Sequence, residues 1–282
     1  MNNGMYSVED FGCEVDYSEI SRGGVARIVR TPVQEAADWR KITPADISRG
    51  ALGRELRYLS LLLEKMKHEQ APVLFTVFSP ITTAGKLSGN RLLTHIEEGH
   101  GEEVRQALAI ITETTCQLVK KAIELGAAGI YLATQLSSYE IMSEDLYREY
   151  GMPYDLEVLK ASRGWCNVVH AHGVNPMFNL LKDYPSHVFN WHAYETLPDV
   201  DEAALLTGKC LMGGIYRMDI TKGDRNAVRN QIFRTVKAMQ GRSLILSPSC
   251  VIRYPLDDDM LGFIRKVKQD IEEALGHVRK LA

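Results

Sequence analysis

Two short stretches of this chain combine residue types that bind metal ions. His170-Ala-His-Gly follows the apolar run 166–169, and Ser-Pro-Ser-Cys250 follows the apolar run 243–246. Each stretch stands where an apolar run stops, so we expect both at the C-terminal ends of parallel strands, where α/β enzymes place their catalytic residues. Imidazole and thiolate groups are ligands that zinc accepts. The pattern therefore predicts a catalytic zinc site and, with it, an enzyme.

His170 and His172 are two residues apart. Alternate residues of a strand point to the same side of the sheet, so both imidazoles could reach one metal ion. We expect Cys250 to be the third ligand, and His172 and Cys250 to take part in catalysis. The competing interpretation is that the histidines are ordinary strand residues and that Cys250 is a structural thiol, because a free cysteine behaves as a small hydrophobic residue.

Other polar side chains at the expected strand ends are candidate cofactor or substrate contacts. Gln135, Tyr139 and Glu140 follow the apolar run near residue 130, and any of them could also supply a fourth metal ligand. His192 closes another apolar run. Arg217 follows a pair of glycines that would allow a ligand to approach the backbone closely, or would only relieve crowding.

The composition excludes several classes of protein. With 282 residues, of which 45% are hydrophobic, the chain can bury one large core or two small ones. A net charge of −3 gives no electrostatic reason to expect nucleic acid or an anionic membrane as a partner. We see no signal peptide and no apolar stretch long enough to cross a bilayer. The five scattered cysteines suit a reducing compartment, so we expect a cytoplasmic protein.

Helical and strand patterns alternate along most of the chain, which indicates a parallel sheet covered by helices. A closed (β/α)8 barrel of the TIM type has eight strands. The six strands predicted here therefore mean either that the barrel is incomplete in this chain or that the pattern does not reveal two of its strands. Six apolar runs are the predicted strands, namely Pro72–Phe78, Gly129–Ala133, Cys166–His170, Val188–Trp191, Cys210–Ile215 and Ser243–Leu246. Helices are predicted over Glu55–Met66, Val104–Ile123 with a stop at Gly126, from Ser143 onward, and over 177–181, 199–207, 226–240 and 260–278.

Residues 1–50 do not supply the two missing strands. They predict a β-hairpin in which Cys13–Tyr17 pairs with Val25–Val29, with Gly23-Gly24 at the turn, followed by a loop. We therefore expect an N-terminal hairpin and loop over 1–50 and a barrel domain over 51–282.

From about Phe11 to its end, the chain resembles the uroporphyrinogen decarboxylase (URO-D) superfamily. This superfamily also contains zinc-dependent methyltransferases that act on corrinoid proteins and thiols. The resemblance implies a (β/α)8 barrel with its site at the C-terminal mouth. The segments that carry it are Phe78–Thr83, Ala128–Ala133, Ser143–Tyr154, His170–Gly173, Asn190-Trp191, Gly208–Ile215 and Leu246–Cys250.

The chain departs from the decarboxylases at every hallmark position that can be placed. Those enzymes begin with a strand and an arginine-rich loop that grips the substrate carboxylates, and a second strand region carries a catalytic aspartate. This chain is expected to start after both. Lys86 or a neighbour stands in the region of the decarboxylase's active-site tyrosine, and Cys250 stands where the decarboxylase has its late histidine.

The methyltransferase branch matches better. It has His-x-Cys-Gly followed much later by a second cysteine, and here His170 and Cys250 match residue for residue, while His172 replaces the middle cysteine. The resemblance thus implies a His2Cys zinc site in place of a HisCys2 site. With one thiolate fewer, zinc would be a stronger Lewis acid, which could weaken methyl transfer to a thiol and favour activation of water.

We therefore expect a URO-D superfamily enzyme that uses zinc to transfer a methyl group to a thiol or a corrinoid, with a small molecule or a corrinoid protein as substrate. Two alternatives stay open. One is uroporphyrinogen decarboxylase-like activity, for which the candidate cations are Arg91, Arg217 and Arg253. The other is a non-catalytic member that binds a tetrapyrrole or a partner protein. The unpaired edges of a six-stranded barrel also predict self-association into a homo-oligomer such as a dimer.

Overall fold

The structure is a computed structural model, and it describes residues 4–22, 24–252 and 257–281. The chain divides into two compact parts. Unit 1 comprises Met1–His170 and Tyr184–His187, and unit 2 comprises Ala171–Asp183 and Val188–Ala282. The division falls inside one strand, between His170 and Ala171.

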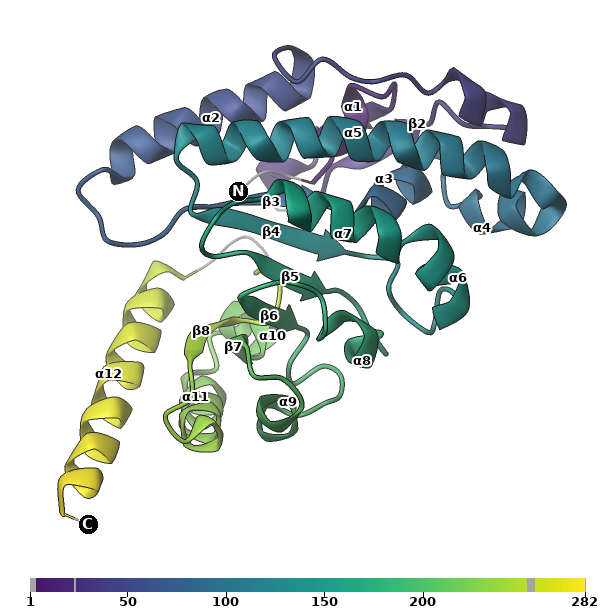
Figure 1. The fold of residues 1–282 in the computed structure, drawn as a ribbon. Helices are drawn as coiled ribbons and strands as arrows, with labels where there is room; N and C mark the ends of the chain where they lie inside the picture. Colours follow the sequence, from purple (N-terminus) through teal and green to yellow (C-terminus); the bar gives the residue numbers. More distant parts are fainter. Residues whose placement is uncertain (1–3, 23, 253–256, 282) are drawn as a thin grey trace. The chain divides into compact units, whose positions relative to one another are not determined.

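The six strands of the larger sheet follow one another in the sheet in the same order as in the chain (Figure 1). Within unit 1, β3 and β4 pair in parallel, and within unit 2, β6, β7 and β8 do so. All six predicted strands are confirmed, which supports the predicted α/β class. They are β3 (Leu74–Phe78), β4 (Gly129–Thr134), β5 (Val168–Ala171), β6 (Val188–Trp191), β7 (Cys210–Ile215) and β8 (Leu244–Pro248).

Helices connect these strands. The long helices of the sequence analysis are confirmed, and the structure adds several short helices that periodicity did not predict. The helices of unit 1 are α1 (Tyr6–Glu9), α2 (Gly50–Met66), α3 (Pro80–Leu87), α4 (Leu92–His95), α5 (Gly101–Leu125), α6 (Glu144–Tyr150) and α7 (Met152–Ala161), with the 3-10 helices η1 (Ile20–Arg22) and η2 (Ala36–Lys41) and the π-helix η3 (Ile96–His100). Those of unit 2 are α8 (Phe178–Leu181), α9 (Val200–Leu206), α10 (Arg217–Lys222), α11 (Arg225–Met239) and α12 (Asp258–Leu281).

Local sequence signals explain where several helices begin and end. The backbone of Gly126 is left-handed, with φ 113°, and its N–H bonds to the last turn of α5, which is the conformation that favours glycine after a helix. The Ser143 hydroxyl accepts a hydrogen bond from the Leu146 N–H at 3.2 Å and so caps α6. Both helix ends therefore follow from residues that the sequence analysis identified.

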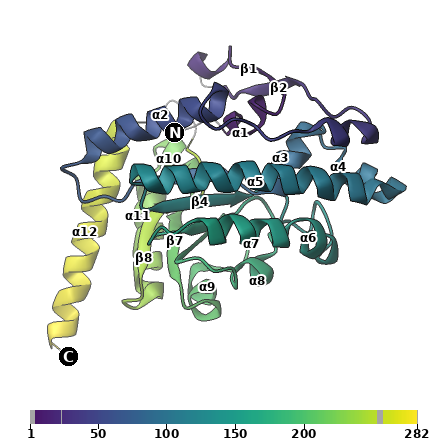
Figure 2. The ribbon, with the colours of Figure 1, turned by 45° about the horizontal axis from the view of Figure 1, so that its top comes forward.

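In unit 1, helix α5 lies against α2 and α7, as Figure 1 shows. Its apolar stripe, which includes Val104, Leu108 and Ile111, is fully buried. In unit 2, helices α11 and α12 lie beside each other, and α11 also packs against β7 (Figure 2). One core cluster of this unit consists of Ile215, Ile220, Val228, Ile232, Met260 and Val267.

The second glycine of β7 is explained by packing. The backbone of Gly214 has φ +98°, and a Cβ atom there would lie 2.4 Å from Cγ2 of Thr235 in α11. The Thr235 hydroxyl donates a hydrogen bond to the Gly214 carbonyl at 3.0 Å. Of the two roles that the sequence left open for this glycine, the structure therefore favours relief of crowding between strand and helix.

The N-terminal hairpin is confirmed as a two-stranded antiparallel sheet of β1 (Glu14–Asp16) and β2 (Arg27–Arg30). Its register places carboxylates opposite guanidinium groups, with Glu14 facing Arg30 and Asp16 facing Arg27. The connection between the two strands contains η1. Gly23 lies outside the described residues.

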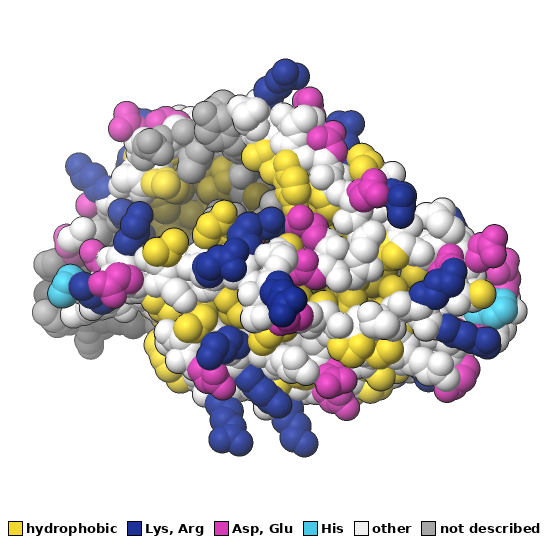
Figure 3. All heavy atoms as spheres, turned by 90° about the horizontal axis from the view of Figure 1, so that it is seen from above, with side chains coloured by type: hydrophobic (Ala, Val, Ile, Leu, Met, Phe, Trp, Pro, Cys, Tyr) yellow, Lys and Arg dark blue, Asp and Glu magenta, His cyan; other side chains and the backbone are white. Residues whose placement is uncertain are grey.

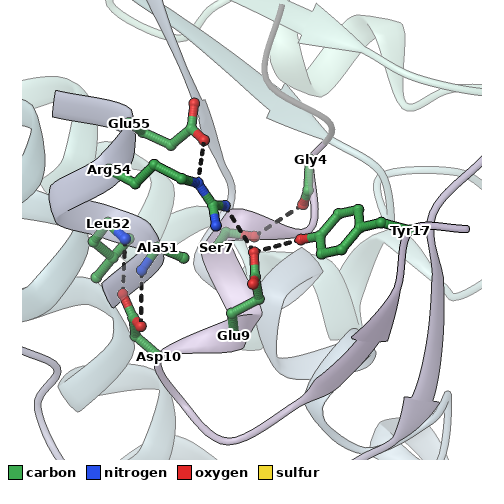
Figure 4. Close-up of polar contacts among 9 residues, drawn as sticks. All are labelled: Gly4, Ser7, Glu9, Asp10, Tyr17, Ala51, Leu52, Arg54 and Glu55. Atoms are coloured by element: carbon green, nitrogen blue, oxygen red, sulfur yellow. Dashed lines mark hydrogen bonds and ion pairs between the residues drawn. The ribbon is translucent and has the colours of Figure 1, made fainter. Parts of the chain in front are cut away.

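The segment before this hairpin is anchored on α2 (Figure 4). The Asp10 carboxylate accepts hydrogen bonds from the Ala51 and Leu52 N–H groups at 3.0 and 2.7 Å. The Arg54 guanidinium donates to Glu9 at 2.9 Å. The predicted division into segments 1–50 and 51–282 stays a prediction, although these contacts fasten the first segment to the first long helix of the second.

Charges of both signs are interspersed with apolar side chains on the face shown in Figure 3, in keeping with the net charge of −3. Among the described residues, no helix combines the length and the apolar character needed to cross a membrane. The five cysteines, all of which lie in the described part of the chain, are free thiols in the structure.

Candidate metal centre

Within the part of unit 2 that the structure describes, three possible metal ligands converge. The ligand atoms of His172, His192 and Cys250 lie within 4.8 Å of one another. The rings of His172 and His192 meet edge to face, with their centroids 4.7 Å apart and their planes at 74°. Two imidazoles and a thiol form a donor set that zinc accepts at about 2.0–2.3 Å per bond. Small side-chain adjustments would bring these three groups to one ion.

All three residues lie just beyond the C-terminal ends of strands. His172 directly follows β5, His192 directly follows β6, and Cys250 stands two residues beyond β8. Trp191 anchors the end of β6, because its buried indole N–H donates to the Pro198 carbonyl at 3.0 Å. In unit 2 the structure therefore places His172 and Cys250 close together, and their roles as metal ligands and catalytic residues stay predictions.

His170 belongs to unit 1 and lies in β5, two residues before His172, which directly follows that strand. Its side chain is 3% exposed. Its ring stacks on that of Tyr131 in β4, with 5.2 Å between the centroids, and its carbonyl accepts a hydrogen bond from the Thr134 hydroxyl at 2.9 Å.

A carboxylate that the sequence analysis did not identify faces the group. Oε2 of Glu195 lies 3.0 Å from Nη2 of Arg217 and 3.5 Å from Nδ1 of His192. Oε1 of the same carboxylate accepts a hydrogen bond from the Ser249 hydroxyl at 3.1 Å. The only sequence signal for Glu195 is its position three residues after His192, beyond a strand end. The only sequence signal for Ser249 is its position directly before Cys250.

Burial governs the protonation states of the possible ligands. Burial lowers the pKa of His192, with Glu195 opposing that shift and Arg217 reinforcing it. The imidazole is therefore neutral at neutral pH, which is the form that binds a metal. Burial raises the pKa of the Cys250 thiol. A divalent ion would have to displace that proton, and the resulting thiolate would in turn balance part of the ion's charge.

Gln135, Tyr139 and Arg91, which the sequence analysis also named, each have hydrogen-bond partners of their own. Gln135 and Tyr139 belong to unit 1, where the Tyr139 hydroxyl donates to Glu144 and the Gln135 N–H donates to the Thr82 hydroxyl at 2.9 Å. Arg91 is exposed and bonds to Gln34. Arg253 lies outside the described residues. The substrate or cofactor roles of Gln135 and Tyr139 stay predictions.

The family model for uroporphyrinogen decarboxylase (URO-D) matches residues 5–264 of this chain. Among curated proteins, the methylcobamide:CoM methyltransferases MtbA of Methanosarcina acetivorans and Methanosarcina mazei are each 23% identical over 155 residues. Each match covers 55% of this chain and 44% of the relative, so less than half of each relative's length is matched.

Solved structures show the same fold. A methyltransferase from Methanosarcina mazei superimposes with a TM-score of 0.82 at 18% sequence identity, covering 95% of this chain and 78% of that one. A B12-independent methionine synthase from Shewanella sp. W3-18-1, in complex with selenomethionine, gives a TM-score of 0.55 at 11% identity, covering 80% of this chain and 68% of that one. At these sequence identities, both comparisons show that the fold is shared.

Proposed function

The chain belongs to the uroporphyrinogen decarboxylase (URO-D) family, and from this premise we propose that it is a zinc-dependent methyltransferase that acts on a thiol or a corrinoid. The observation that carries the proposal is the convergence of His172, His192 and Cys250 within 4.8 Å in unit 2. The similarity to methylcobamide:CoM methyltransferases supports methyl transfer as the reaction class.

The residues present fit zinc. Neutral imidazoles and a thiol are soft to borderline donors, and a set of two or three such protein ligands leaves a position for substrate. We propose His172 and Cys250 as ligands, as the sequence predicted, and His192 as the third because of its place in the group. The role of His170 as a ligand stays a prediction from the sequence. Zinc held there would lower the pKa of a substrate thiol, so that the reactive thiolate is available at neutral pH.

The chain's own residues would prepare the site for this reaction. The burial of His192 removes water from around the reacting groups, which strengthens electrostatic interactions inside the site. Arg217 brings a positive charge close to Cys250. Its Nε atom is buried and has no hydrogen-bond partner among the described residues. We propose that Arg217 contacts an anionic part of the substrate through this nitrogen, since its Nη2 atom is paired with Glu195. Gln135 and Tyr139 keep the substrate or cofactor roles predicted from the sequence. The substrate would be a small molecule or a corrinoid protein.

Decarboxylation of uroporphyrinogen is the second candidate, because the matching family model carries that name. A substrate with many carboxylates requires several cations. The cation beside the convergent group among the described residues, Arg217, is paired with Glu195 at 3.0 Å. This pairing favours methyl transfer over decarboxylation. A non-catalytic role in binding a tetrapyrrole would require no convergent metal ligands at all.

The test uses purified protein with zinc, methylcobalamin and a panel of small thiols. In the expected reaction the methyl–cobalt bond and the S–H bond break, a carbon–sulfur bond forms, cob(I)alamin leaves with the electron pair, and the proton goes to solvent. We expect thioether formation by the wild type and at least a hundredfold loss in His172→Ala and Cys250→Ser. A zinc-loaded protein without methyl transfer to any thiol would oppose the proposal. Conversion of uroporphyrinogen to coproporphyrinogen above background would favour the second candidate.

A further inference from the structure

We propose that Glu195 is a positioning residue that fixes His192 and the segment of Cys250 without itself binding the metal. The inference rests on the proposed function, because it concerns the same zinc site. It assigns a role to a carboxylate whose contacts all lie within unit 2, at the C-terminal ends of β6, β7 and β8.

The contact with His192 would set which ring nitrogen faces the metal. A neutral imidazole carries one proton, and a carboxylate beside Nδ1 favours the tautomer that has its proton on that nitrogen. Oε2 of Glu195 lies 3.5 Å from Nδ1 of His192. His192 is 3% exposed, so bulk water cannot readily take over this role. The lone pair of Nε2 is then left for the metal.

The contact with Ser249 acts on the other ligand. The Ser249 side chain is fully buried, and its hydroxyl donates to Oε1 of Glu195 at 3.1 Å. The Ser249 N–H donates to the Ile215 carbonyl at 3.1 Å. These two bonds hold the residue that precedes Cys250, so they limit where the thiol can point. One carboxylate thus links the segments of two ligands that are more than fifty residues apart in the chain.

Arg217 keeps the carboxylate in this role. Carboxylate oxygens are themselves zinc ligands in many proteins, yet the oxygens of Glu195 do not belong to the convergent group. Nη2 of Arg217 lies 3.0 Å from Oε2, and the Glu195 side chain is only 16% exposed. The guanidinium compensates the negative charge of the buried Glu195 carboxylate. It is paired with Oε2, the same oxygen that lies near Nδ1 of His192. Glu195 therefore adds orientation to the site and no net negative charge.

The experiment compares zinc binding by the wild type, Glu195→Gln and Glu195→Asp, measured by chelator competition, with X-ray absorption at the zinc edge. Glu202→Gln is the matched control, because Glu202 is an exposed residue of unit 2. We expect Glu195→Gln to bind zinc about 10–100-fold more weakly than the wild type, with the same nitrogen and sulfur donors around the metal. Glu195→Asp should recover part of the affinity, and Glu202→Gln should match the wild type.

Equal affinity in the wild type and Glu195→Gln would overturn the positioning role while leaving the zinc site in place. An oxygen donor that is present in the wild type and missing in Glu195→Gln would show that Glu195 is a ligand, which also overturns it. A wild type that binds no zinc would refute the proposed function itself. If Glu195→Gln does not fold, Ser249→Ala, which keeps the carboxylate, should still weaken zinc binding severalfold, and unchanged binding by this variant would overturn the proposal.

Discussion

The imidazole of His172 meets that of His192 edge to face, with their centroids 4.7 Å apart. One ring follows β5 and the other follows β6, so two strand ends of the sheet each contribute one aromatic nitrogen base. The sequence predicted His172 as a metal ligand and His192 as a cofactor or substrate contact at another strand end, and the structure places the two rings side by side. A change at His172 should therefore affect both the metal and its neighbour.

We predict that His172→Cys binds zinc more tightly than the wild type. A thiolate is a softer donor than imidazole and brings a negative charge, so zinc affinity should rise while Lewis acidity falls. Methyl transfer to a thiol should become faster if that is the reaction. His172→Ala should bind zinc much more weakly. Chelator competition measures all three affinities, and three equal values would mean that His172 is not a ligand.

A second prediction concerns a buried acid of unit 1. The Asp155 side chain is fully buried, and its Oδ2 accepts hydrogen bonds from the hydroxyls of Tyr147 and Tyr184 at 2.6 and 3.2 Å. Burial raises the pKa of Asp155 to about 6, with the hydrogen bonds opposing that shift. The carboxyl group therefore contributes most stability when it is protonated, below its ordinary pKa near 4. This contribution is lost as the pH rises through about 6.

Asp155→Asn removes this titration and keeps an oxygen that can accept both bonds. The free energy of unfolding of the wild type, relative to that of the variant, should fall by about 2–3 kcal/mol between pH 4 and pH 8. Denaturant titrations at both pH values measure the difference. Asp183→Asn, at an exposed position, is the control and should show no such change. A difference that stays constant for Asp155→Asn would contradict the buried titration.

The strands were predictable because each is a short apolar run that alternates with helical periodicity, so local composition reports burial on both faces of a parallel sheet. Val188–Trp191 and Cys210–Ile215 agree with the prediction residue for residue. The short helices were not predictable in this way. Helix α10, for example, has six residues, only one of which, Ile220, is buried, so it carries almost no apolar periodicity.

The site was predictable only in part. His172 and Cys250 stand at strand ends, which local sequence reveals. Glu195 lies in a loop, and its role depends on Arg217 and Ser249, which reach it from other strand ends. Sequence periodicity cannot predict such a contact between side chains of different loops. The hydrogen bonds of Asp155 could not be predicted from the sequence either, because its tyrosine partners come from separate segments of the chain.

A third prediction concerns the anchoring of the N-terminal segment on α2. Asp10 accepts bonds from two N–H groups of the first turn of this helix, across forty-one and forty-two residues of sequence (Figure 4). We expect Asp10→Ala to lower the free energy of unfolding by about 1–2 kcal/mol, because it leaves helix N–H groups without their cap. Glu64→Ala, near the other end of α2 in an exposed ion pair with Lys67, is the control. Equal stability of both variants in denaturant titrations would contradict this role.

A fourth prediction is that the protein self-associates. Among the described residues, β3 and β8 are the outer strands of the six-stranded sheet. Outer strands of a sheet favour association with another chain. Sedimentation at micromolar concentration should show a homo-oligomer, with a dimer as the simplest form. Only monomer at that concentration would count against the prediction.

The most direct test of the account is the metal content of the purified protein. After exposure to zinc and removal of the excess, elemental analysis should find about one zinc per chain in the wild type and far less in Cys250→Ser and His172→Ala, because a thiolate and an imidazole are lost from the ligand set. The variants should unfold cooperatively, which shows that the loss is local. A wild type without zinc, or variants that retain as much zinc as the wild type, would contradict the assignment of His172 and Cys250 to a metal centre.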